Sequence, residues 1–139
     1  MTTNVLTPTK IEQSWDTKKI QETTAKAFTN NMMATMGVLR EYGEEAMEKF
    51  QVASRAPMVR YYKEQLKVTT PIELARAKAE YETNVFGSVV EIKGDEKEAQ
   101  VKYLSCAVWN EMKCHLNEKQ QEEMGTCFQS CISNFAKEF

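Results

Sequence analysis

The chain has 139 residues, of which 42% are hydrophobic and 27% charged, and its formal net charge is -2. This length and balance are typical of one globular domain with its own core. Lysine and arginine are interleaved with glutamate along the sequence, which argues against nucleic-acid binding. The apolar runs are too short to span a bilayer and the first residues lack the apolar centre of a secretory signal, so we expect a cytoplasmic protein without a membrane partner.

An N-terminal arm and a long helix are predicted first. Residues 1–15 show no sustained period and are expected to form an arm that packs through Ile11 and Trp15. From Asp16, a favourable N-cap, apolar residues repeat at helical spacing as far as Tyr42. This segment is the first core helix of a helical half that covers residues 16 to 83.

The second helical segment, residues 44–67, contains a proline and two adjacent tyrosines. Because proline removes a backbone donor and clashes with the preceding turn, the helix is predicted to be kinked or split at Pro57. A kink there could open a cavity beside Tyr61 and Tyr62, which makes both tyrosines candidate ligand-binding residues. The simpler alternative is a bend that wraps the helix around the core.

A third helix and a hairpin follow. Thr70 and Glu73 have the spacing of a capping box, and the helix that they begin is predicted to end near Thr83. The period then changes from near four to two, which predicts an antiparallel β-hairpin over residues 84–105 with a polar turn at 93–97.

The last segment, residues 106–139, holds all four cysteines and the only histidine. Cys106 is predicted to lie in the first turn of a short helix, where the positive end of the helix dipole would make its thiol more acidic than a free one. Trp109 in the same helix is a further candidate for ligand binding. Cys127 and Cys131 lie four residues apart in the final predicted helix and therefore share one face.

Three interpretations of the cysteines follow from these patterns. In the first, they belong to the core, where free cysteine is common. In the second, Cys106, Cys127 and Cys131 bind zinc or an iron–sulfur cluster, and His115 or Glu123 completes the ligand set. In the third, Cys106 is a catalytic nucleophile and His115 relays the proton.

The order of the elements, with the segments GEEAMEKFQVASRA, VKYLSCAVW and GTCFQSC, resembles the family named for L-2-amino-thiazoline-4-carboxylic acid hydrolase. More distantly, it resembles the 4-vinyl-reductase-type ligand-binding domain. In the hydrolase family one cysteine closes the second strand and another begins the following long helix, and these would correspond to Cys106 and Cys127. The resemblance implies an α+β domain with a cysteine-lined cavity between the hairpin and the helices.

The sequence therefore predicts a mostly helical α+β domain, with about five helices packed on a small antiparallel hairpin. Its expected function is that of a small-molecule hydrolase or a related thiol-dependent enzyme. The alternative is a non-enzymatic module that binds a small ligand, a tetrapyrrole or a metal, and serves a partner protein. The two open edges of a two-stranded sheet also favour a homodimer.

Overall fold

The computed structural model describes residues 7–125 and 136–139. Cys127 and Cys131, and with them the predicted pair on the final helix, lie outside the described residues. In chain order the elements are α1 (Thr17–Arg40), α2 (Glu44–Arg60), the π-helical segment η1 (Tyr61–Gln65), α3 (Pro71–Tyr81), the π-helical segment η2 (Glu82–Phe86), β1 (Val89–Gly94), β2 (Ala99–Ser105) and α4 (Ala107–Lys113). Residues 118–125 are also helical. The predicted α+β class, mostly helical with one antiparallel hairpin, is confirmed.

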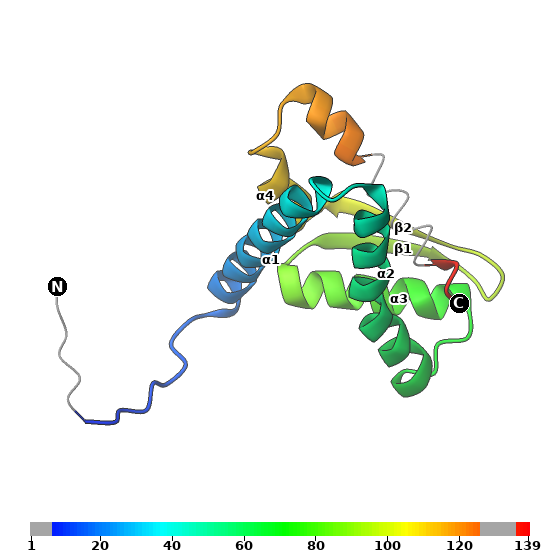
Figure 1. The fold of residues 1–139 in the computed structure, drawn as a ribbon. Helices are drawn as coiled ribbons and strands as arrows, with labels where there is room; N and C mark the ends of the chain where they lie inside the picture. Colours follow the sequence, from blue (N-terminus) through cyan, green and yellow to red (C-terminus); the bar gives the residue numbers. More distant parts are fainter. Residues whose placement is uncertain (1–6, 126–135) are drawn as a thin grey trace.

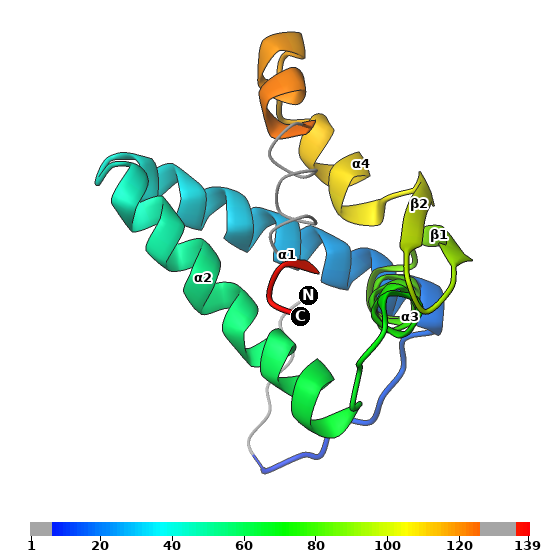
Figure 2. The same ribbon diagram turned by 90° about the vertical axis from the view of Figure 1, so that its right-hand side faces the viewer.

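The hairpin and the helices meet around α3 and α1 (Figures 1 and 2). Strands β1 and β2 pack on α3, and α1 contacts α2, η2 and α4. The turn between α1 and α2 gives the two helices the outline of a V in Figure 2. Helix α4 begins shortly after β2 and contacts α1. Its first residues therefore lie close to both the sheet and the first helix.

The predicted helix starts are confirmed by their hydrogen bonds. The Asp16 carboxylate accepts a hydrogen bond of 2.8 Å from the Lys19 amide at the start of α1. At the start of α3, Thr70 and Glu73 form the complete capping box. These bonds satisfy amides that have no partner inside the helix, which is why the local sequence is enough to predict them.

The second helix is not split at Pro57. Helix α2 runs through this residue to Arg60, and the chain then continues as η1, which contains Tyr62. The change in helix type therefore begins four residues after the proline. Because π-helical turns are rare and are often found at functional sites, the position of Tyr62 in such a turn is relevant to the site described below.

The predicted start of the hairpin at residue 84 is wrong. Val85 and Phe86 belong to η2, and the first strand begins at Val89. Phe86 is buried against the ring of Phe28, with 5.0 Å between ring centroids. Gly87, with φ of 76°, then ends η2 in the left-handed conformation that glycine adopts without steric cost. Because Phe86 packs in the core, the helical region continues to this residue, beyond the point where the hydrophobic period of the sequence changes to two.

The alternation of the two strands is confirmed. The partly buried residues are Val90 and Ile92 on β1 and Ala99, Val101 and Tyr103 on β2, and the other residues of the two strands are exposed. The turn is fixed by Asp95, whose carboxylate accepts hydrogen bonds from the amides of residues 97 and 98. One face of the hairpin is therefore available to pack on α3.

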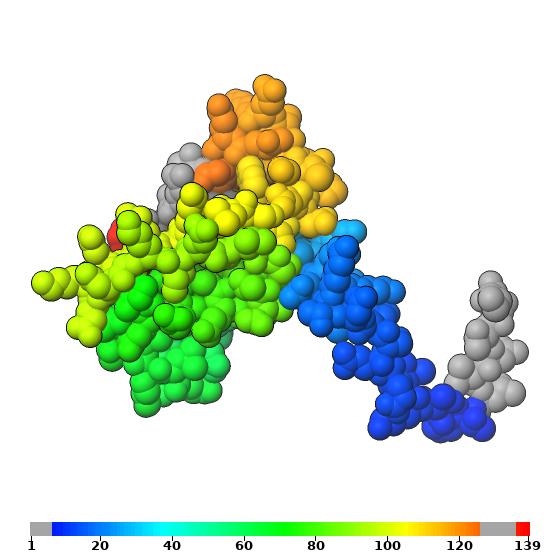
Figure 3. All heavy atoms as spheres, turned by 180° about the vertical axis from the view of Figure 1, so that it is seen from behind, coloured from blue at the N-terminus to red at the C-terminus, as the bar shows by residue number. Residues whose placement is uncertain are grey.

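Residues 7–15 of the N-terminal arm extend away from the helices and the hairpin (Figures 1 and 3). Ile11 is 86% exposed, so the prediction that the arm packs through this residue is wrong. Trp15 is 46% exposed, and the Lys19 ammonium lies 4.5 Å from its ring centroid. Across residues 7–125 and 136–139, no helix has both the length and the apolar character needed to cross a bilayer.

A small hydrophobic core lies where α1, η2 and α4 meet. Its buried members are Ala25, Phe86, Val108 and Met112. Partly buried residues packed against them include Met32, Met33, Tyr81, Cys106 and Trp109. The core therefore reaches the start of α4 and partly encloses Cys106.

Candidate functional site

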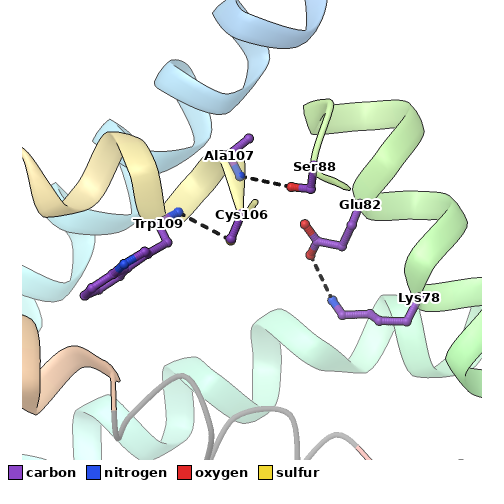
Figure 4. A network of polar contacts seen from close by, with 6 residues as sticks. All are labelled: Lys78, Glu82, Ser88, Cys106, Ala107 and Trp109. Atoms are coloured by element: carbon purple, nitrogen blue, oxygen red, sulfur yellow. Dashed lines mark hydrogen bonds and ion pairs between the residues drawn. The ribbon is translucent and has the colours of Figure 1, made fainter. Parts of the chain in front are cut away.

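Cys106 lies at the junction between β2 and α4. It is the N-cap of α4 rather than a residue of its first turn, and its sulfur accepts a hydrogen bond of 3.4 Å from the Trp109 amide (Figure 4). The side chain is half-buried. A cysteine in this position has its sulfur beside the exposed amides of a helix N-terminus, as the strand-to-helix junction in the sequence predicted.

Ser88, the residue immediately before β1, fixes this junction. It is 2% exposed, and its hydroxyl oxygen accepts a hydrogen bond of 3.0 Å from the Ala107 amide (Figure 4). Because this amide is at the first position of α4, it has no partner within the helix. Ser88 thus connects the end of η2 to the residue that follows Cys106.

We expect Ser88→Ala to lower the free energy of unfolding by about 1–3 kcal/mol, since it leaves the part-buried Ala107 amide without this acceptor. Urea denaturation followed by circular dichroism measures the loss. The matched control is Ser54→Ala, because the Ser54 hydroxyl makes only an exposed bond within α2. Equal losses in the two variants would contradict the anchoring role of Ser88.

A nearly buried carboxylate faces the thiol. The Glu82 side chain is 12% exposed, and its Oε1 atom lies 3.4 Å from the ammonium of Lys78, which is 29% exposed. Figure 4 shows the Glu82 carboxylate and the Cys106 side chain pointing toward one another. The second oxygen, Oε2, is buried and has no hydrogen-bond partner among the described residues. Glu82 is the first residue of η2, so it too lies in a π-helical turn.

Three tyrosines complete the cluster. Burial raises the pKa of Tyr62 to about 12, and the charges of Tyr81 and Glu82 add to the shift. Burial is the largest cause that raises the pKa of Tyr103 and of Tyr81, and the Glu82 charge is the second. All three hydroxyl groups therefore remain neutral hydrogen-bond donors at physiological pH, and the Glu82 charge acts on each of them.

The predicted acidity of Cys106 is wrong. Burial is the largest influence on this thiol and raises its pKa, and the nearby Glu82 carboxylate raises it further. The amides of Trp109 and Val108 and the Lys78 ammonium lower the pKa, as a helix N-terminus should, but they do not reverse the shift. The resting thiol is therefore neutral, and less of it is ionised than in a free cysteine at the same pH.

His115 is not brought to Cys106. The histidine is exposed in the turn after α4, whereas the cysteine caps the beginning of that helix. A helix of seven residues is about 10 Å long. The predicted proton relay between His115 and Cys106 therefore has no support in the structure, and Glu82 is the titratable group that faces the thiol.

The three predicted ligand-binding aromatic residues have different positions. Tyr62 is 1% exposed and belongs to the cluster, whereas Tyr61 is 41% exposed. The indole of Trp109 packs against the hydrophobic core and, in Figure 4, extends away from the Cys106 sulfur. Of the three, only Tyr62 is thus assigned to the cluster, because it is buried and the Glu82 charge acts on it.

The predicted metal site is described only in part. Of its cysteines, Cys106 is described and Cys127 and Cys131 are not. Within residues 7–125 and 136–139, no three histidine, cysteine, aspartate or glutamate side chains form a group that could hold a metal ion. The zinc or iron–sulfur site stays a prediction.

Two pockets stand out among the described residues, and neither is lined by a cysteine. One, of about 360 Å³, lies between the start of α1 and η2, where Trp15, Phe28 and Tyr81 line it. The other, of about 280 Å³, lies along α2. The cysteine-lined cavity implied by the family resemblance stays a prediction.

Glu82, Lys78, Ser88 and Tyr103 were not predicted as site residues. Lys78 and Glu82 have the i, i+4 spacing of an ordinary exposed helical ion pair, so the sequence gives no reason to expect them beside a thiol. Tyr103 belongs to the predicted hairpin, whose alternating pattern indicates only that it faces inward. The one available signal was that Glu82 comes shortly before the apolar residues of η2, which places it near a buried face.

Comparison with protein-family models, with curated proteins and with solved structures finds no match to this chain.

Proposed function

We propose that this domain binds a small polar molecule at the cluster formed by Glu82, Cys106 and the three tyrosines. The observation that carries the proposal is the nearly buried Glu82 carboxylate, which faces the Cys106 thiol and influences the pKa values of all three tyrosines. A carboxylate removed from water is stabilised by charged or hydrogen-bonding partners. Lys78 supplies such a partner for one of its oxygens.

The chemistry of the cluster defines the kind of ligand. The Oε2 atom of Glu82 accepts hydrogen bonds, so it favours a ligand with an N–H or O–H donor or a cationic group. The neutral hydroxyls of Tyr62 and Tyr103 can donate to an acceptor on the same molecule. The Cys106 thiol, neutral because burial raises its pKa, adds a polarisable surface. A small amine or amino alcohol combines these features.

Thermal denaturation with a set of small primary amines and amino alcohols tests the proposal. We expect at least one of them to stabilise the protein, by about 2.7 kcal/mol at one hundred times its dissociation constant. The effect should be lost in Glu82→Gln and retained in the matched control Glu80→Gln, which changes an exposed carboxylate near the end of α3, two residues earlier. The assignment would be refuted if these compounds stabilised both variants equally. It would also be refuted if they stabilised neither the variants nor the wild type.

The second candidate is the thiol-dependent hydrolase, with Cys106 as the nucleophile. The specific observation in its favour is the pair of helix amides, from Val108 and Trp109, that favour a thiolate at the N-terminus of α4. The family resemblance supports the same activity. Burial and the Glu82 charge act in the opposite direction, so we rank catalysis second; the pH dependence of alkylation described in the Discussion distinguishes the two candidates.

A further inference from the structure

A second pocket, separate from the Cys106 cluster, lies along α2 and η1. Its volume is about 280 Å³. Its apolar lining residues are Val52, Ala56 and Val59 from α2. The charged lining residues are Arg55, Arg60, Lys63, Glu64 and Glu138. Glu138 lines this pocket and contacts Arg55 of α2.

Arg55 forms an ion pair with Glu138 in this pocket and is the less exposed residue of the pair. Its side chain is 19% exposed, and its Nη2 atom lies 3.7 Å from the Oε1 atom of Glu138. The Nε atom is buried and has no hydrogen-bond partner within the part of the chain that the structure describes. A guanidinium presents several donors in one plane, so Arg55 has capacity for an anion beyond its contact with Glu138.

The residue next to Glu138 supplies an aromatic ring to the same region. The Phe139 ring centroid is 6.4 Å from that of Tyr62, and the Lys63 ammonium is 5.3 Å from the Phe139 ring. Glu138 and Phe139 together therefore place a carboxylate and an apolar ring against cationic and apolar side chains. This pair has the chemical character of an aromatic carboxylic acid.

The charges of the pocket favour an added anion. Three cations, Arg55, Arg60 and Lys63, and two carboxylates, Glu64 and Glu138, line it. If Glu138 moved away, three cations would face one carboxylate. The pocket would then attract an external anion, and the apolar side chains that line it would favour an anion that carries a hydrocarbon portion.

From these contacts we propose that the α2 pocket is a binding site for a small organic carboxylate with an apolar portion, and that Glu138 pairs with Arg55 in the wall of the pocket in the absence of that ligand. An external carboxylate would pair with Arg55 in place of Glu138. The ligand and the Glu138 side chain would therefore compete for Arg55. This proposal is independent of the function assigned to Cys106.

Isothermal titration of the full chain with 3-phenylpropionate tests the proposal, with 3-phenylpropan-1-ol and inorganic phosphate as comparison ligands. We expect saturable binding of 3-phenylpropionate and weaker binding of both comparison ligands, each of which lacks one of the two features. Because Glu138 is half-exposed, its removal in Glu138→Gln should tighten binding only modestly, by about threefold. Arg55→Met should weaken binding at least fivefold, on the order expected for loss of a charged hydrogen bond.

Matched controls separate the pocket from general charge effects. Glu12→Gln and Arg76→Met make the same changes at exposed positions outside the pocket, and both should leave the affinity unchanged. If Arg55→Met does not fold, Arg60→Met tests the same charge at an exposed position of the pocket. Binding of the alcohol or of phosphate as tight as that of 3-phenylpropionate would overturn the ligand class. An affinity unaffected by Glu138→Gln would overturn the competition.

Discussion

Replacing Phe86 with alanine is expected to lower the free energy of unfolding by about 3–5 kcal/mol, the range typical of a buried aromatic residue. Phe86 is 5% exposed and contacts two rings, with centroid distances of 5.0 Å to Phe28 and 5.8 Å to Tyr81. Since it also belongs to the core that includes Met112, its removal leaves a cavity between η2, α1 and α4. Urea denaturation, with the m-value fitted for each variant, measures the change.

Leu104→Ala is the control for this substitution. Leu104 is 52% exposed on β2, so truncating it removes apolar surface that is already largely in water, and we expect a loss below about 1 kcal/mol. Similar losses for the two variants would mean that Phe86 does not form the centre of the core. A changed m-value in Phe86→Ala would indicate that the substitution alters how much surface unfolding exposes.

The second large effect concerns the ionisation of Cys106. Because burial and Glu82 raise its pKa, the thiolate fraction at neutral pH is low, and alkylation by iodoacetamide should reach half its maximum rate at a higher pH than in the urea-unfolded chain. Glu82→Gln removes a negative charge that opposes the thiolate. The midpoint should therefore move to lower pH, and alkylation at neutral pH should become severalfold faster.

Peptide mass mapping measures each cysteine separately in this experiment. The exposed Cys114 is an internal control whose rate should not change, and Glu80→Gln is the matched variant at an exposed position of α3. An unchanged midpoint in Glu82→Gln would show that this carboxylate does not influence the thiol. A wild-type midpoint below that of the unfolded chain would favour the thiol-dependent enzyme over the binding module.

The sequence by itself determined the features that depend on neighbouring residues. The cap at Asp16 and the capping box of Thr70 and Glu73 are predictable because each joins groups three residues apart. The inward alternation of Val101 and Tyr103 is predictable because side chains of a strand alternate between its faces. The position of Cys106 at a strand-to-helix junction belongs to this local class as well.

Only the tertiary structure decided which side chains meet at Cys106. Glu82 precedes it by 24 positions in the sequence and reaches it because the hairpin reverses the chain and packs on α3. The pKa of the thiol is decided at the same level, since burial and a carboxylate from another element outweigh the local effect of the helix N-terminus. Likewise, the segment that contains Phe86 is helical because the Phe86 ring is buried against Phe28. Local periodicity records which residues prefer to be inside, but it carries no information about the partners that they meet there.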